Sequence, residues 1–170
     1  NLSLTARNWL VGYYIVEFEQ HGEDRAKYGE NLLKNLAKRL NRRGLGERRL
    51  YEFRLIYIIY PQIGQVIADY IAKNNPQDIL RLPTAKLQIV ENLEDENLRL
   101  LTAKSHGEEW LTPADRLFNR LSATHFVLLS TIKDPLKRAF YEQETIRGCW
   151  TVKELDRQIS SQYSERMGVS

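Results

Sequence analysis

The stretch over residues 28–60 most constrains the fold, because it predicts two helices joined by a tight glycine turn. The apolar residues of its first half recur at helical spacing: Leu32, Leu33, Leu36, Ala37 and Leu40. Such spacing is typical of a helix with one buried face. Gly44 then breaks the pattern, and glycine readily adopts the left-handed conformation that ends a helix. We expect a second helix to begin at about Glu47.

Most of the positive charge is concentrated where these two helices meet. Residues 38–54 carry seven basic and two acidic residues, a local net charge of +5, whereas the whole chain has +3. The basic residues are Lys38, Arg39, Arg42, Arg43, Arg48, Arg49 and Arg54. Arg48 and Arg49 are near the start of the second helix, where the recognition helix of a helix-turn-helix meets nucleic acid. The pattern predicts DNA binding, mostly through phosphate contacts, with Arg48 or Arg49 as candidates for base edges.

The same basic residues can also be interpreted as the solvated faces of amphipathic helices. In that case Glu52 or the acidic stretch over residues 91–96 would pair with them. The apolar residues at Trp9, Tyr13 and 55–60, together with the C-terminal helix, would then form a homodimer or dock a partner protein. An oligomerisation or partner-interaction module is therefore the alternative function. Both functions can hold together, since helix-turn-helix proteins often bind DNA as dimers.

The length and composition favour one helical domain or two smaller ones. A chain of 170 residues with 42% hydrophobic content can build a sizeable core. Helical patterns cover residues 3–20 and 63–73 and a C-terminal part over about 112–166. Residues 74–111 form a variable excursion whose structure the pattern leaves open. The predicted fold class is all-α, either as one bundle or as two helical subdomains on either side of the excursion.

Signals for helix starts mark the last third of the chain. Four residues are placed to cap helices: Thr112, Ser122, Asp134 and Thr151. Pro135 follows Asp134 at the favoured first helical position, and Glu154 completes a capping box with Thr151. In the helix that follows Asp134, helical spacing predicts that Leu136 faces inward.

The chain shows no catalytic or metal-binding pattern. His21, His106 and His125 are far apart in sequence and belong to no metal-ligand motif, so we expect neither a metal nor another cofactor. The single cysteine, Cys149, is expected to be a buried apolar filler and fits a reducing, cytoplasmic location. No apolar run reaches eighteen residues, so no membrane partner is expected. Because the chain lacks an initiator Met, we expect it to be a piece of a longer protein.

Five stretches carry a resemblance to a known family: residues 6–17, 28–40, 43–60, 133–142 and 150–155. In this order they resemble the N-terminal domain of the bacterial YhcG-like family, a domain of unknown function. Full-length members of that family fuse it to a PD-(D/E)XK nuclease domain. The resemblance implies a mostly helical, DNA-associated domain whose partner is a C-terminal nuclease domain. Gly46 stands where the family often has a capping Ser or Thr, a change that costs only about a few tenths of a kcal/mol.

The nuclease chemistry of that family can be tested on the sequence itself. It requires carboxylates that hold a divalent metal and a Lys two positions after an Asp or Glu. None of the lysines in this chain has an acidic residue two positions before it. We therefore expect that this chain is not itself an enzyme and that the nuclease domain is absent from it.

Overall fold

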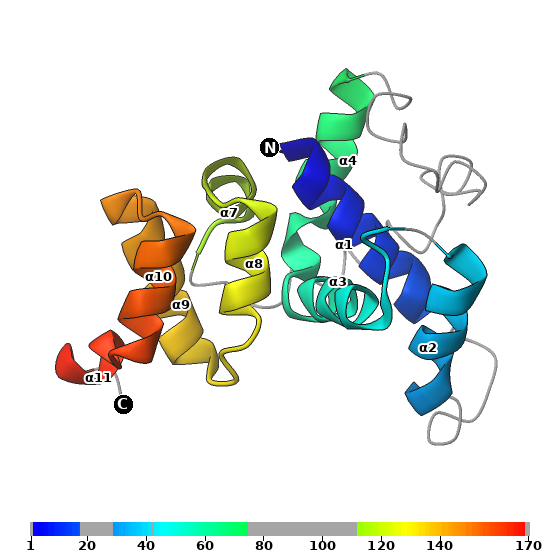
Figure 1. The fold of residues 1–170 in the computed structure, drawn as a ribbon. Helices are drawn as coiled ribbons and strands as arrows, with labels where there is room; N and C mark the ends of the chain where they lie inside the picture. Colours follow the sequence, from blue (N-terminus) through cyan, green and yellow to red (C-terminus); the bar gives the residue numbers. More distant parts are fainter. Residues whose placement is uncertain (1, 18–28, 42, 75–111, 169–170) are drawn as a thin grey trace.

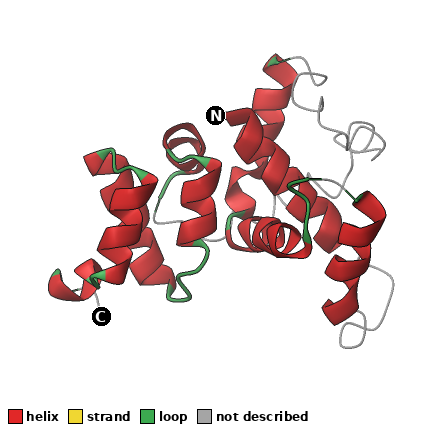
Figure 2. Ribbon diagram, in the orientation of Figure 1, coloured by secondary structure: helices red, strands yellow, loops and turns green. Residues whose placement is uncertain are grey.

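The computed structural model describes residues 2–17, 29–41, 43–74 and 112–168, and all regular structure in these ranges is helical (Figure 2). The elements are α1 (Leu2–Glu17), α2 (Gly29–Leu40), α3 (Glu47–Ile59), the 3-10 helix η1 (Pro61–Ile63), α4 (Gly64–Lys73), α7 (Ala114–Arg120), α8 (Ala123–Leu129), α9 (Pro135–Gly148), α10 (Val152–Ser160) and α11 (Tyr163–Arg166). The all-α prediction is confirmed. The excursion predicted over 74–111 lies, from residue 75 onward, outside the described residues.

The helices form two groups with α7 and α8 between them (Figure 1). One group contains α1 to α4, and the other contains α9, α10 and α11. Buried hydrophobic residues form one cluster that runs from Ala6 on α1 to Leu155 on α10. The division of the chain into one bundle or two subdomains stays a prediction.

The first and third helices pack against each other at close range. A Cβ atom at Gly12 would overlap the main-chain carbonyl of Phe53, so this approach requires glycine. An aromatic cluster continues the contact. The ring centroids of Trp9 and Tyr57 are 5.1 Å apart, and those of Tyr13 and Tyr57 are 5.6 Å apart, both edge to face. This geometry is the favoured one for aromatic pairs.

Tyr60, which follows α3, connects the two groups of helices. Its carbonyl oxygen accepts a hydrogen bond from Trp9 Nε1 at 2.9 Å, and its ring packs edge-on against Phe126 of α8 with centroids 4.9 Å apart. Its hydroxyl donates to Oε1 of Glu142 on α9 at 2.8 Å. Burial raises the pKa of Glu142, while the Tyr60 hydrogen bond and the charge of Arg138 act in the opposite direction. Tyr60 therefore contacts α1, α8 and α9 at once.

Side-chain caps begin three helices of the C-terminal part. The caps predicted at Ser122, Asp134 and Thr151 are confirmed. One carboxylate oxygen of Asp134 accepts hydrogen bonds from the backbone N–H groups of Leu136 and Lys137 at 2.8 and 3.1 Å. These contacts satisfy donors that the first turn of a helix leaves unpaired.

Three expectations about side chains are wrong. Thr112 caps nothing, because α7 begins at Ala114 after an N-cap at Pro113 without a side-chain bond, and Thr112 is buried instead. Leu136 is 52% exposed, since its side chain in the first turn of α9 extends beyond the packed core. Cys149 is exposed rather than buried, because it ends α9 in the left-handed conformation with a φ of 48°.

No single helix among the described residues has both the length and the apolar character to cross a membrane. The segments Glu47–Ile59 and Pro61–Lys73 meet such a test only as a pair, and that pair is bent by 82°. Core packing accounts for their apolar character, since Ile56, Ile63 and Ile67 are each no more than 1% exposed.

Candidate nucleic-acid interface

The candidate site lies where α2 ends, the chain turns and α3 begins (Figure 1). α2 buries Leu33 and Leu36 in the core. Lys38 and Arg39, in the last turn of this helix, are exposed to solvent. Positive charge is favourable there, because the helix dipole places partial negative charge at a C-terminal end. Lys38 and Arg39 therefore lie on the solvated side of α2, away from its buried leucines.

The turn between the helices is fixed by one glycine and one buried side chain. Gly44 has a φ of +87°, as its predicted role at the helix end requires. Leu45 is 8% exposed and attaches the turn to the core. Gly46 begins α3 without a side-chain hydrogen bond. Arg43 is exposed on this turn, while the predicted site residue Arg42 lies outside the described residues.

In the first turns of α3, two arginines donate hydrogen bonds to the same carboxylate. Arg48 Nε donates to Oε1 of Glu52, and Arg49 Nη1 donates to Oε2 of the same residue, each at 3.0 Å. The Arg48 and Arg49 side chains are 92% and 57% exposed, whereas that of Glu52 is 12% exposed. One carboxylate neutralises only one of the two guanidinium charges. Because exposed ion pairs are worth about 1 kcal/mol or less, a phosphate can compete with Glu52 for these arginines.

Two further arginines lie deeper in the structure. Arg54 is half-buried, and its Nε atom is buried without a hydrogen-bond partner among the described residues. Arg7 of α1 was not predicted as a site residue. Its guanidinium carbon is 5.9 Å from the ring centroid of Phe53, and it donates two hydrogen bonds to Asn8 Oδ1. Burial and, second to it, the positive charge of Arg49 lower the pKa of Arg7, so this half-buried guanidinium lies within electrostatic range of Arg49.

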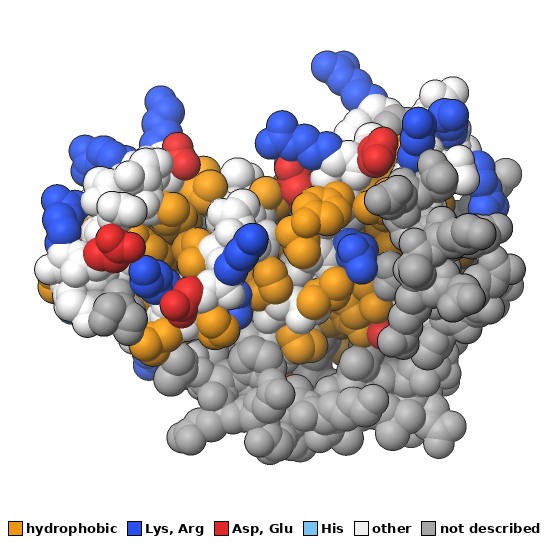
Figure 3. All heavy atoms as spheres, turned by 90° about the horizontal axis from the view of Figure 1, so that it is seen from below, with side chains coloured by type: hydrophobic (Ala, Val, Ile, Leu, Met, Phe, Trp, Pro, Cys, Tyr) orange, Lys and Arg blue, Asp and Glu red, His pale blue; other side chains and the backbone are white. Residues whose placement is uncertain are grey.

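The outward face of α3 becomes apolar beyond its first turns. Tyr51 and Ile58 are 48% and 47% exposed, and Leu55 lies between them at helical spacing on the same face. Figure 3, seen from below, shows hydrophobic side chains across the middle of the described part of this face, with some Lys and Arg side chains among them and others along its edges. Exposed aromatic and aliphatic side chains are more typical of a protein interface than of phosphate contact.

Among the described residues, no group of three or more His, Cys, Asp and Glu side chains is placed to hold a metal ion. Within those ranges His125 belongs to the first turn of α8. Its Nδ1 accepts the backbone N–H of Ser122 at 3.1 Å in a capping box. Burial lowers the pKa of His125, which favours the neutral ring that can accept this bond.

Comparison with known proteins adds a family context to this geometry. The family model described as the DUF1016 N-terminal domain matches residues 1–166. The chain is 34% identical over 169 residues to a protein of Escherichia coli K12 named "Putative nuclease YhcG". The matched region covers 98% of this chain and 40% of that relative, so the chain spans well under half the relative's length. No solved structure matches the chain.

Proposed function

The chain belongs to the family of DUF1016 N-terminal domains, and we propose that it binds DNA and thereby delivers or regulates a nuclease domain of the same parent protein. The observation that carries the proposal is a group of exposed cations around one turn: Lys38, Arg39, Arg43, Arg48 and Arg49. The nuclease name of the E. coli relative supports it, because a nuclease needs a means of holding nucleic acid. Catalysis belongs to another part of the parent protein under this proposal.

Phosphate docking is the mode of binding that this surface suits best. Each exposed Lys or Arg can neutralise a phosphate and release its condensed counterions, which provides affinity without sequence preference. Arg48, at the start of α3 and 92% exposed, is the best placed candidate for a base edge. Arg54 is half-buried and contributes through packing and local potential. In this arrangement α2 and α3 act as a helix-turn-helix in the cytoplasm, where DNA is accessible.

Fluorescence anisotropy with a labelled DNA duplex tests the proposal. We expect Arg48→Gln with Arg49→Gln to weaken binding and to reduce the slope of log affinity against log salt by about 1 to 2 between roughly 50 and 200 mM salt. The matched control is Lys153→Gln with Arg157→Gln, which removes the same charge at similarly close spacing from exposed positions on α10. An unchanged affinity and slope in the Arg48 and Arg49 variant would contradict the assignment.

A module for self-association or partner docking is the second candidate function, favoured by the exposed side chains of Tyr51 and Ile58. An apolar contact of this kind persists at high salt, whereas phosphate contacts weaken steeply. Light scattering across protein concentration and salt separates the two functions. A molecular mass of twice the monomer that persists at high salt supports a homodimer. A monomer mass at every protein and salt concentration excludes one.

A further inference from the structure

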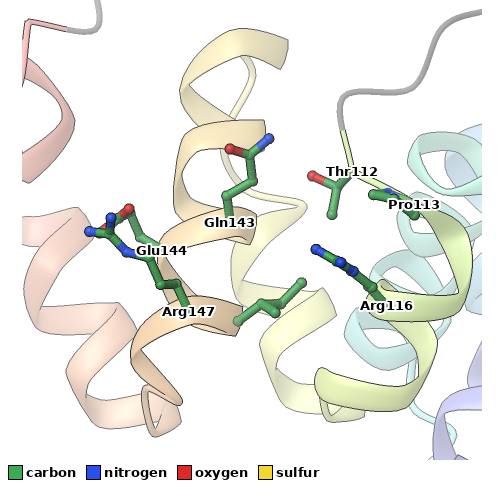
Figure 4. A pocket seen from close by; sticks show the side chains of 7 residues that line it. Thr112, Pro113, Arg116, Gln143, Glu144 and Arg147 are labelled. Carbon is green, nitrogen blue, oxygen red and sulfur yellow. The ribbon is translucent and has the colours of Figure 1, made fainter.

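A groove between α7 and α9 carries a second set of arginines, on helices that contribute nothing to the basic turn (Figure 4). Two adjoining cavities of ≈ 510 and ≈ 600 Å³ share Arg116, Ile146 and Arg147 in their walls. Arg116 and Arg120 are one helical turn apart on α7 and are both exposed. Residues four apart on a helix have Cβ atoms about 6 Å from each other, so both side chains can reach one ligand.

The arginines of this groove differ in whether they form an ion pair with an acidic side chain. Arg147 Nη2 pairs with Oε2 of Glu144 at 2.7 Å, and Figure 4 shows this pair turned away from Arg116. Arg116 extends from α7 toward α9 in the same view. Neither Arg116 nor Arg120 has an ion pair or a hydrogen bond within the part of the chain that the structure describes. Among the described lining residues, the acids are Asp115 and Glu144 and the bases are Arg116, Arg120 and Arg147, so these residues carry an excess of positive charge.

We infer that this groove binds the phosphate group of a nucleotide. The guanidinium groups of Arg116 and Arg120 offer planar forks of N–H donors that match phosphate oxygens. Ile146 supplies an apolar wall and Asn119 an amide that can hydrogen-bond the sugar or base. Each cavity has the size of a small-molecule site. The phosphate can belong to a free nucleotide or to a nucleic-acid strand, and neither case depends on DNA binding at the turn between α2 and α3.

Isothermal titration of the 170-residue chain with adenosine monophosphate, adenosine and a single-stranded oligonucleotide tests the inference. We expect Arg116→Gln with Arg120→Gln to weaken binding of the phosphate-bearing probes by at least about tenfold, since hydrogen bonds to charged groups are the strong ones. Lys153→Gln with Arg157→Gln is again the control for lost charge, because neither residue lines the groove. Thermal unfolding confirms that each variant remains folded.

The outcomes distinguish the source of the phosphate and the two sites. Binding of adenosine monophosphate supports a free nucleotide, while binding of the oligonucleotide alone supports a strand, provided that the Arg116 and Arg120 variant loses it. The inference is overturned if neither probe binds, if adenosine binds as well as its monophosphate, or if the control loses as much affinity. The Arg48 and Arg49 variant should keep groove binding, so a failure of the basic turn and a failure of the groove give different results.

Discussion

The N-terminal and C-terminal groups of helices are stabilised in different ways. α1 and α3 contact each other through an aromatic cluster and the close approach at Gly12, and α3 begins without a side-chain cap. By contrast, α9 and α10 begin with side-chain caps at Asp134 and Thr151. Contacts between residues far apart in sequence hold the first group. The second group combines its local caps with aromatic contacts of Tyr163 to Phe140 and Trp150, at centroid distances of 5.7 and 5.9 Å.

This difference bears on the proposed DNA site. Arg49 extends from α3 close enough to Arg7 of α1 to affect its pKa, and Arg7 stacks on Phe53. The position of the basic residues on α3 therefore depends on the packing of α3 against α1. A substitution that loosens this packing should also disturb DNA binding, even though it removes no charge.

Replacing Trp9 by alanine is expected to have the largest effect. Trp9 is 1% exposed, contacts Tyr57 and donates a hydrogen bond to Tyr60, so Trp9→Ala should reduce the free energy of unfolding by about 3–5 kcal/mol. Urea denaturation followed by circular dichroism measures this change in the free energy of unfolding. Tyr51→Ala is the matched control, because Tyr51 is 48% exposed on α3 and its loss should change stability by no more than about 0.5 kcal/mol. Equal losses in both variants would contradict the central place of the α1–α3 contact.

Removing the hydroxyl of Tyr60 tests the connection between the two groups. Tyr60→Phe deprives the buried Glu142 carboxylate of its 2.8 Å hydrogen bond and should cost about 1–3 kcal/mol at neutral pH. Phe126→Leu is a useful companion, since it trims the ring that packs on Tyr60 and leaves the hydrogen bond in place. Denaturation midpoints of the three proteins give the comparison.

The cost of Tyr60→Phe should depend on pH. Burial raises the pKa of Glu142 above its unfolded value, so its contribution to stability is present below the unfolded pKa and is lost as pH rises through the folded pKa. The Tyr60 hydroxyl opposes this loss by stabilising the charged carboxylate. Tyr60→Phe should therefore destabilise the protein more at pH 7 than at about pH 4. A cost that does not change with pH would show that the carboxylate is not involved.

The contrast between the two groups also explains what could be predicted from the sequence. The starts of α8, α9 and α10 followed from capping residues, because a cap and its helix are neighbours in the chain. The helical continuation through residues 55–59 followed from the helical start at Glu47. The exposure of Leu136 could not be predicted, because periodicity identifies the face of a helix but not whether another element covers it.

The candidate site was only partly predictable, because the sequence shows which residues are neighbours in the chain but not which helices pack together. The charged cluster was visible because Lys38, Arg39, Arg43, Arg48 and Arg49 are close in sequence. Arg7 is 42 positions before Arg49, and only the α1–α3 packing brings their charges together. The shared carboxylate of Glu52 needed no tertiary information, since positions three and four apart are neighbours on any helix.

A cap substitution in the C-terminal group is expected to have the smallest effect of the three stability tests. Asp134→Ala removes hydrogen bonds to two backbone N–H groups at the start of α9 and should cost about 1 kcal/mol. Asp156→Ala is the control, because this aspartate is exposed on α10, away from any helix start. Urea denaturation of both variants at pH 7 gives the comparison. A loss of stability in Asp134→Ala as large as that in Trp9→Ala would contradict this order, because it would show that the C-terminal group depends on its caps as much as the N-terminal group depends on its core.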